Sequence, residues 1–529
     1  MKSKNLLYSY YFLILIILML GIFFRVVNLD KKVYWHDEIH TSLHITGFTA
    51  KEWHPSLFNG EVITQDSLQY HLKINDKKSL ADTINTLVFD DPHHPPLYYI
   101  LVRYWRQFWG DSITVIRSFS VLVSLWIFPA IYWLCWELFK QPIISSLCLA
   151  LVAVSPLYVF YAQEAREYAL FTVLIALSTA SLLRSIRLTK DANIPQERCY
   201  LSWGVYLILT TLSLYTSLFS IFVIIAQAIY TLLIEKNAFN KVTIFYGISL
   251  VISCILFAPW MIVLIQNYEQ YKRANNWMIA VTLPPEELLK TWGLNLSRLF
   301  FDLGWEIDTL LTYFIIILCL LLVSYSLYFL YKKSALKSWL FVFSLVFIQI
   351  FFLLGPDLLW GGVRSLSPRY LIPFYLGINL SVAYLLGIKL THSTNKITKV
   401  WSMITIIILS LGIISCWINS QKDTAWTKVI SYSLPQVAQI INKIDSPLVI
   451  SNDQGYHPGN IMALSYLLNP EVKFQLLSQE KQYKFPKGFQ TIFLLSPTDE
   501  FKLTLEKETK VKAKLMFGDA YLKLWKIEV

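Results

Sequence analysis

The stretch 155–170 reads SPLYVFYAQEAREYAL and places three charged residues between two apolar runs, 143–160 and 168–188. A helix that crosses a bilayer needs ~20 mostly apolar residues, so each run is close to the length of one crossing. Charged side chains at the ends of such helices commonly mark a functional site, although Glu164 and Arg166 would equally suit a structural ion pair. The stretch therefore predicts a membrane protein with a charged turn at one face.

The composition of the whole chain agrees with a bilayer environment. Of 529 residues, 55% are hydrophobic and 15% are charged, and mean hydropathy is +0.48, whereas soluble domains carry about a quarter charged residues. The net charge of +11 lies in short clusters between apolar runs rather than on one basic face, so no nucleic-acid partner is expected. None of the six cysteines lies in a long polar segment, which makes a disulfide framework unexpected.

About eleven apolar runs are expected to cross the membrane. They lie near 6–27, 113–138, 143–160, 168–188, 201–215, 218–234, 243–265, 310–331, 339–354, 370–388 and 400–418. No cleavage site follows the first run, so it is expected to be a retained helix. The positive-inside rule then places the basic loops near 140, 184–198, 236–241, 332–337 and 389–399 in the cytoplasm. This alternation requires the segment 95–109 to be an interfacial helix, a depth that would suit its Arg103, Arg106 and aromatic residues.

The loops on the other face are the polar ones, namely 28–94, 163–167, 266–308, 355–369 and the tail from 419. We therefore expect a mainly α, multi-pass protein of the plasma or inner membrane, with the active site and C-terminus outside the cytoplasm. A transmembrane domain would cover 1–418, including the first outer loop 28–94. A small α/β domain would cover 419–529, because strand-like and helix-like runs alternate there. No internal repeat is evident, which disfavours transporters built from two repeated halves.

Adjacent carboxylates follow the first apolar run, in the sequence YWHDEIH (34–40). Burial beside a membrane would raise the pKa of one carboxyl group, as a general base requires. Alternatively, Asp37 and Glu38 would simply form the first turn of a loop helix, where acidic residues are favoured. Two further motifs are DDPHHPPLYY (90–99), whose prolines can begin a helix, and SPRY (367–370), whose Arg369 could bind a phosphate or anchor a helix.

The ordered set of these motifs resembles the family of membrane glycosyltransferases that contains protein O-mannosyltransferases and lipid A aminoarabinose transferases. The resemblance covers about the first 190 residues clearly, continues more weakly to about 390 and does not extend to the tail. It implies the GT-C membrane fold. It also implies an enzyme that moves a sugar from a polyprenyl-phosphate carrier to a lipid, protein or glycan acceptor outside the cytoplasm.

The resemblance implies specific roles for the motif residues. Asp37 matches the family's catalytic aspartate, which would deprotonate the acceptor hydroxyl, and Glu38 matches its neighbour. His94 stands where the aminoarabinose transferases have a lysine near the lipid phosphate, which leaves its protonation state open. Glu164 and Arg166 match the acidic and basic pair after the third span, and Arg369 matches a late basic residue. Tyr98, in the HPPLYY motif, is placed with the substrate-binding residues.

The residues support this chemistry without the resemblance. Displacement of a polyprenyl phosphate from a sugar needs a base for the incoming hydroxyl and cations for the leaving phosphate. A single base opposite the leaving group predicts inversion at the anomeric carbon. We expect no organic cofactor and see no Gly-rich phosphate loop. The tail carries none of the motifs, so it is expected to tune the acceptor rather than perform the reaction.

Two other classes and a metal-dependent variant stay open at this level. A lipid or polysaccharide transporter would place charged residues in the middle of several spans, and a non-catalytic scaffold would not need Asp37 or Arg166. Histidines 36, 40, 44, 93 and 94 lie near carboxylates, so a divalent metal is conceivable. We nevertheless predict no metal ligands, because histidines at membrane boundaries often only form hydrogen bonds.

Overall fold

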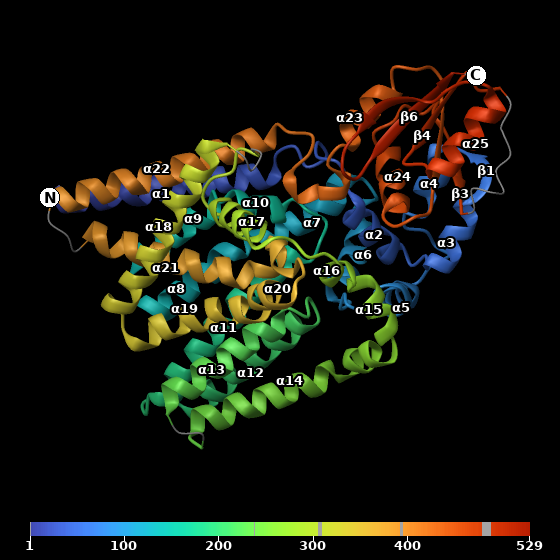
Figure 1. Ribbon diagram of the computed structural model, residues 1–529. Coiled ribbons are helices and arrows are strands. Elements are labelled where there is room, and N and C mark those ends of the chain that lie inside the picture. Colours follow the sequence, from blue (N-terminus) through green and yellow to red (C-terminus); the bar gives the residue numbers. More distant parts are fainter. Residues whose placement is uncertain (1, 237–238, 305–308, 392–394, 479–487, 529) are drawn as a thin grey trace. The chain divides into compact units, whose positions relative to one another are not determined.

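The structure is a computed structural model that describes residues 2–236, 239–304, 309–391, 395–478 and 488–528 (Figure 1). Contacts divide the chain into two compact units. The first comprises Met1–Val27, Asp91–Tyr98 and Arg117–Ser420, and the second comprises Asn28–Asp90, Tyr99–Ile116 and Gln421–Val529. This division differs from the predicted domains 1–418 and 419–529, because the first outer loop packs with the tail. The loop 28–90 and the tail are more than 300 residues apart in the sequence, so local sequence patterns do not show their contact.

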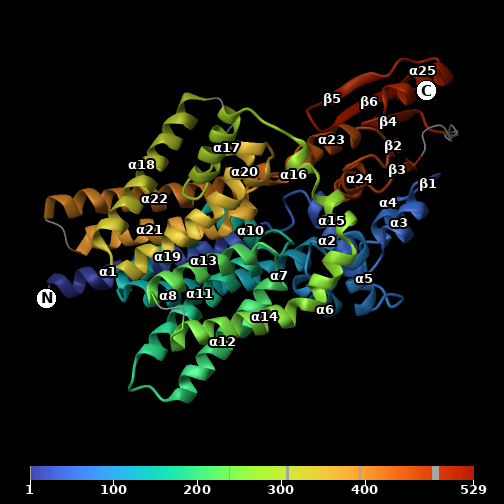
Figure 2. The ribbon, with the colours of Figure 1, turned by 60° about the horizontal axis from the view of Figure 1, so that its bottom comes forward.

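Helices make up the first unit. They are α1 (Lys2–Val26), α7 (Ile113–Leu125), α8 (Ile127–Phe139), α9 (Pro142–Ala153), α10 (Pro156–Ala162), α11 (Tyr168–Lys190), α12 (Gln196–Leu214), α13 (Ser220–Glu235), α14 (Lys241–Gln266), α15 (Tyr268–Asn275), α16 (Trp277–Ala280), α17 (Pro285–Ser297), α18 (Leu310–Lys333), α19 (Leu336–Gln349), the π-helix η1 (Ile350–Leu354), α20 (Gly355–Trp360), η2 (Arg364–Leu366), η3 (Pro368–Leu371), α21 (Ile372–Thr391) and α22 (Asn395–Ser420). Helix α12 packs against α11 and α14, and Figure 2 shows the three side by side.

Within the described residues, seven helices are long and apolar enough to cross a membrane, and the bent pair α9–α10 would make an eighth. The chain is therefore an integral membrane protein, and seven of the expected crossings coincide with these helices. The remaining expected crossings fall on α1, α12 and α13. Within the residues whose side chains are described, α1 and α13 contribute the shorter apolar helices Phe12–Val26 and Ser220–Glu235, and α12 is less apolar than the seven long helices. The count of about eleven is thus not reproduced.

A bend of 62° separates α9 from α10. Pro156, at the first turn of α10, cannot continue the hydrogen bonding of α9. The buried Arg25 guanidinium donates to the carbonyls of Val152 and Ala153 at the end of α9, at 3.0 and 2.7 Å. Free carbonyls are costly within a bilayer, so this arginine stabilises the break. The bend positions the charged turn that precedes α11.

The cytoplasmic loops predicted from the positive-inside rule contribute ion pairs at the ends of neighbouring helices. Glu137, near the end of α8, accepts from Lys140 at 2.7 Å and from Arg187 of α11 at 2.9 Å. Lys190 at the end of α11 pairs with Glu235 at the end of α13 at 2.7 Å. The basic ends of α8, α11 and α13 therefore meet, as the predicted alternation of spans requires.

The second unit combines short helices with one sheet. The helices are α2 (His36–Thr46), α3 (Ala50–Leu57), α4 (Gln65–Tyr70), α5 (Leu80–Asp90), α6 (Leu97–Trp109), η4 (Trp426–Ser431), α23 (Leu434–Ile441), α24 (His457–Ser465) and α25 (Asp499–Thr509). The strands are β1 (Asn59–Ile63), β2 (Leu448–Asn452), β3 (Lys473–Leu477), β4 (Thr491–Leu495), β5 (Lys514–Gly518) and β6 (Lys523–Glu528), in the order β1-β3-β2-β4-β6-β5.

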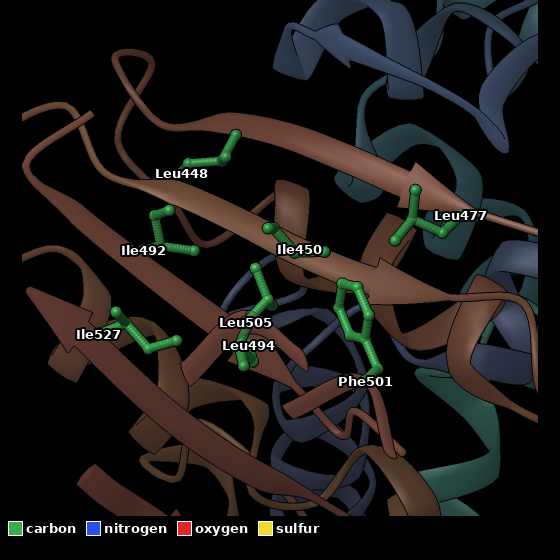
Figure 3. Close-up of a cluster of buried hydrophobic side chains, with 8 residues drawn as sticks. All are labelled: Leu448, Ile450, Leu477, Ile492, Leu494, Phe501, Leu505 and Ile527. Atoms are coloured by element: carbon green, nitrogen blue, oxygen red, sulfur yellow. The ribbon is translucent and has the colours of Figure 1, made fainter. Parts of the chain in front are cut away.

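The central strands of this sheet are parallel, because β2 pairs in parallel with both β3 and β4. The edge strand β1 comes from the first outer loop and pairs antiparallel with β3. Buried aliphatic residues of β2, β3, β4 and β6 pack against Phe501 and Leu505 of α25 (Figure 3). Because β1 belongs to this sheet, the first loop and the tail form one folding unit.

Helix α6 is present, and its two arginines are buried within the protein. Arg103 is 2% exposed and donates to the Ile45 carbonyl at 2.7 Å, and Arg106 is 1% exposed and bonds Asp111 at 2.9 Å. The exposed residues are aromatic, with Phe108 and Trp109 exposed by 81% and 66%. Arg103 and Arg106 thus bind partners inside the second unit, and the interfacial depth of α6 stays a prediction.

Candidate functional site

The motif 91–98 is held in the first unit by backbone contacts with two helices. The Trp260 indole of α14 donates to the Pro92 carbonyl at 3.2 Å, and the Leu97 amide donates to the Tyr215 carbonyl at 3.1 Å. Pro95 and Pro96 precede α6, as the motif predicted. These contacts fix His94, whose own amide donates to the Asp91 carbonyl at 3.1 Å.

The structure brings His94 together with Arg166, as the predicted binding site requires. One guanidinium nitrogen of Arg166 lies 3.0 Å from His94 Nε2. A guanidinium can only donate, so His94 Nε2 accepts and the ring proton resides on Nδ1. His94 Nδ1 lies 3.3 Å from Glu167 Oε1, and this carboxylate oxygen accepts a hydrogen bond from the Nδ1–H group. Arg166 and Glu167 also pair with each other at 3.4 Å.

The electrostatics of this triad resolve the protonation state that the sequence left open. Burial is the largest cause that lowers the pKa of His94 to about 4, and the neighbouring His93 and Arg166 lower it further. Arg166 and His94 lower the pKa of Glu167 to about 2 against the effect of burial. At neutral pH, His94 is therefore neutral and Glu167 is charged. His94 orients Arg166 and supplies no positive charge itself.

Tyr168 connects Arg166 to the second predicted cation, Arg369. The Arg166 and Arg369 guanidinium carbons lie 5.6 and 5.8 Å from the centroid of the Tyr168 ring. The Tyr168 hydroxyl also lies 3.3 Å from Arg166 Nε. Guanidinium groups gathered at one aromatic ring concentrate positive charge, and arginine recognises phosphate through charge-assisted hydrogen bonds. One basic site is thus formed by two sequence segments, SPRY (367–370) and AREY (165–168).

A third arginine near this site was missed by the sequence reading. Arg298, at the end of α17, is 8% exposed and interacts electrostatically with Tyr161 and Tyr375. Glu164 and Arg369 act electrostatically on the same Tyr161. Burial lowers the pKa of Arg298 to about 10, so it stays charged at neutral pH. No motif surrounds Arg298, which lies within the expected outer loop 266–308, so the sequence offered no signal for it.

Two other predicted residues, Tyr98 and Glu164, support the backbone of Arg166. Tyr98 is fully buried, and its hydroxyl lies 2.8 Å from Ser120 Oγ, which donates to the Arg166 carbonyl at 3.4 Å. Tyr98 therefore supports the backbone of Arg166. Glu164 is 2% exposed and accepts the Arg166 amide through its backbone carbonyl at 2.8 Å. This bond shapes the turn that presents the arginine.

Asp37 and Glu38 belong to the second unit, in the first turn of α2. The positive end of a helix dipole favours carboxylates there, as the alternative structural reading expected. The two side chains differ in environment. Glu38 is fully buried and lies 3.4 Å from Lys428 Nζ, whereas Asp37 is half-buried. A half-buried carboxylate can meet a substrate, and a fully buried one cannot.

Asp91, His93 and His94 are a group that could hold a metal ion, with one ligand atom of each within 4.8 Å of the others. His93 Nδ1 lies 2.5 Å from Asp91 Oδ1. However, His94 Nε2 already accepts from Arg166, and His94 Nδ1 faces Glu167. A cation bound to His94 would meet the Arg166 guanidinium. The geometry therefore favours His94 as the partner of Arg166 over His94 as a metal ligand.

The first unit is a bundle of apolar helices with a basic cluster beside one connecting turn, and the second unit contains a small mixed sheet. The solved structure of ArnT from Cupriavidus metallidurans bound to undecaprenyl phosphate is similar over 98% of both chains, with a TM-score of 0.54 and 11% identity. The Archaeoglobus fulgidus oligosaccharyltransferase tethered to an acceptor peptide is similar over 88% of this chain and 64% of its own, with a TM-score of 0.52 and 12% identity.

These similarities confirm the predicted GT-C fold. ArnT is a lipid A aminoarabinose transferase, one of the two groups named in the sequence resemblance, and both similar proteins are GT-C glycosyltransferases. No protein-family model and no curated protein sequence matches the chain. At this level of identity the comparison establishes the fold, and the activity has to be argued from the residues.

Proposed function

We propose that this protein is a glycosyltransferase that moves a sugar from a polyprenyl-phosphate carrier to an acceptor outside the cytoplasm. The observation that carries the proposal is the cluster of Arg166 and Arg369 on Tyr168, with His94 and Glu167 fixing Arg166. Clustered guanidinium groups recognise phosphate through charge-assisted hydrogen bonds. The ArnT structure of the same fold contains undecaprenyl phosphate.

In this proposal Asp37 is the general base. Its carboxylate removes the proton from the acceptor hydroxyl while that oxygen attacks the anomeric carbon. The bond from that carbon to the phosphate oxygen breaks, and the electron pair leaves on the polyprenyl phosphate. Arg166 and Arg369 stabilise the charge on the leaving phosphate, with Arg298 as an additional cation. Attack opposite the leaving group inverts the anomeric centre.

The proposal includes the location of the site. The protein would lie in the plasma or inner membrane, with its basic helix ends in the cytoplasm and the α2 and AREY segments on the other face. A lipid-linked sugar would then reach the arginines from the bilayer. The acceptor would approach Asp37 from the aqueous side.

The experiment uses purified full-length protein and undecaprenyl-phosphate-linked pentoses and hexoses. Release of undecaprenyl phosphate measures the reaction, and native mass spectrometry measures lipid binding. Asp37→Asn should lower the rate by ~10²–10⁴ with binding nearly unchanged, because it removes a base and keeps the size of the side chain. Arg166→Ala should instead weaken binding, since each charge-assisted hydrogen bond contributes ~1.5–3 kcal/mol.

The control for binding is Arg184→Ala, which removes an exposed arginine of α11. It should change neither quantity. Equal rates for the parent and Asp37→Asn proteins at saturating donor and acceptor would remove Asp37 from the mechanism. Absence of any release by the parent across the sugar panel would contradict the proposed activity.

A further inference from the structure

The tail contributes a lysine to the helix that carries the candidate base. Lys428, in η4, is 1% exposed, and its Nζ lies 3.4 Å from Glu38 Oε2 and 5.1 Å from the centroid of the Trp35 ring. Glu38 is fully buried. A buried carboxylate and a buried ammonium group are each costly unless paired, so the position of each depends on the other.

The backbone around Lys428 is held in an unusual conformation. Val429 has φ 23° and ψ −90°, a region that β-branched residues rarely adopt. Neighbouring contacts fix this turn, since the Asn460 side chain of α24 donates to the Ile430 carbonyl at 2.8 Å. Strain of this kind persists only where the surroundings impose it, and it is concentrated at functional sites.

The same segment also binds the start of α2. The His36 amide donates to Ser431 Oγ at 3.2 Å, and Ser431 Oγ donates to Asn460 Oδ1 at 2.6 Å. Gly459 of α24 lies so close to His36 that an added Cβ would be 2.2 Å from the ring nitrogen Nδ1. A larger residue at 459 would therefore displace the first turn of α2. The tail thus frames the residues on both sides of Asp37.

We propose that Lys428 is a positioning residue for the Asp37–Glu38 pair, a role that rests on the proposed function. By binding Glu38, Lys428 fixes the first turn of α2 so that Asp37 faces the acceptor. It also neutralises the buried charge beside the base. The tail then forms part of the catalytic apparatus, although it contains none of the sequence motifs.

Other titratable groups lie on α2 and on the segments packed against it. They are Tyr34, His36, His40 and His44 on or beside α2, Asp82 and Asp90 of α5, Arg103 and Arg106 of α6, His457 of α24, and Tyr466. Lys428 is in ion-pair contact with Glu38, at 3.4 Å. Removal of Lys428 would leave a buried carboxylate next to the base, and burial favours its protonated form.

The test compares Lys428→Met with the double variant Glu38→Gln/Lys428→Met, both in the full chain. The assay is release of undecaprenyl phosphate from the same sugar-linked donors across pH. Lys428→Met should lower kcat between about tenfold and 10²-fold, as expected for a small displacement of a catalytic group, with lipid binding unchanged. Its pH profile should gain an inflection from Glu38, which has lost the ammonium group of Lys428. That inflection should be absent from the double variant, which removes both charges and keeps the buried volume.

A purely structural ion pair would lower thermal stability in Lys428→Met and leave the shape of the pH profile unchanged. That result, or an unchanged kcat in a folded variant, would overturn the positioning role. If Lys428→Met does not fold, the double variant decides, because a parent-like kcat in the absence of both charges would exclude the role. Loss of rate in Asp37→Asn alongside an unaffected Lys428→Met would preserve the proposed function. An inactive parent would remove both proposals.

Discussion

At the scale of single residues, the basic site depends on a histidine that is neutral. His94 lies 3.0 Å from a guanidinium nitrogen of Arg166, and protonated imidazole could not accept that hydrogen bond. Lysine at this position, as in the aminoarabinose transferases, would supply a charge directly. Here the charge comes from Arg166, and His94 holds it in place. With histidine before the paired prolines, the positive charge is therefore carried by Arg166, whereas a lysine at that position would carry it itself.

This arrangement predicts a pH dependence of stability. Because the fold lowers the pKa of His94 from 6.5 to about 4, the unfolded chain takes up a proton more readily than the folded one. Stability contributed by neutral His94 should be present above pH 6.5 and be lost as pH falls toward 4, by up to roughly 3 kcal/mol. Glu167, whose pKa falls from 4.5 to about 2, loses its contribution only below pH 4.5.

Thermal unfolding of the detergent-solubilised protein between pH 7.5 and 4.5 measures this effect. The unfolding temperature of the parent should decrease over this range more steeply than that of His94→Gln, which lacks the titrating group. Arg184→Ala, which removes an exposed arginine of α11 that does not titrate in this range, is the control and should follow the parent. Parallel curves for the parent and His94→Gln would show that His94 does not titrate as described.

Sequence motifs named three residues that the structure places in one cluster, and two further residues of interest emerged only from the structure. Arg166, Arg369 and His94 were predicted from motifs, and the structure brings them to one cluster through Tyr168. Arg298 and Lys428 were not predicted, because each lies far along the chain from the residues it faces. Local patterns report spacing within a helix or turn, and they carry no information on contacts between distant segments.

At the scale of elements, apolar length predicted the long spans, and the shorter expected crossings stay predictions. Most of the apolar residues of α14 and α18 are not buried inside the protein, so both helices are apolar all round and a continuous apolar run was a reliable signal. Helix α12 is interrupted by polar residues that face neighbouring helices. For example, the Tyr206 hydroxyl donates to Gln227 of α13 at 2.8 Å. Interior faces of a bundle tolerate such pairs, which lower the hydropathy of the run.

Orientation of these elements is tested with introduced cysteines. Asp66→Cys and Asn276→Cys should react with an impermeant thiol reagent added to intact cells, because the proposed topology places both loops outside. Asn193→Cys lies in the loop between α11 and α12 and should react only after the membrane is opened. All three positions are exposed, so accessibility is set by the side of the membrane. The parent chain, with its native cysteines, gives the baseline, and a reversed pattern would contradict the orientation.

At the scale of the whole molecule, the sequence motifs and the packing of the tail lead to opposite expectations for the activity of a chain without the tail. Motif content alone predicts that a chain ending near Lys422 still reacts, since every motif lies before that residue. The structure leads to the opposite expectation for two reasons. The edge strand β1 pairs with β3 of the tail, and the buried Glu38 pairs with Lys428.

Truncation after Lys422 should therefore separate binding from reaction. The arginine cluster lies wholly in the first unit, so the inserted truncated protein should retain undecaprenyl phosphate in native mass spectra. Release of undecaprenyl phosphate from a sugar-linked donor should be lost, because the first turn of α2 no longer has Lys428, Ser431 or Gly459 against it. The full-length Glu38→Gln/Lys428→Met protein is the control that removes the ion pair and keeps the tail. A truncated chain that reacts at the rate of the parent would show that α2 and its aspartate need nothing from the tail.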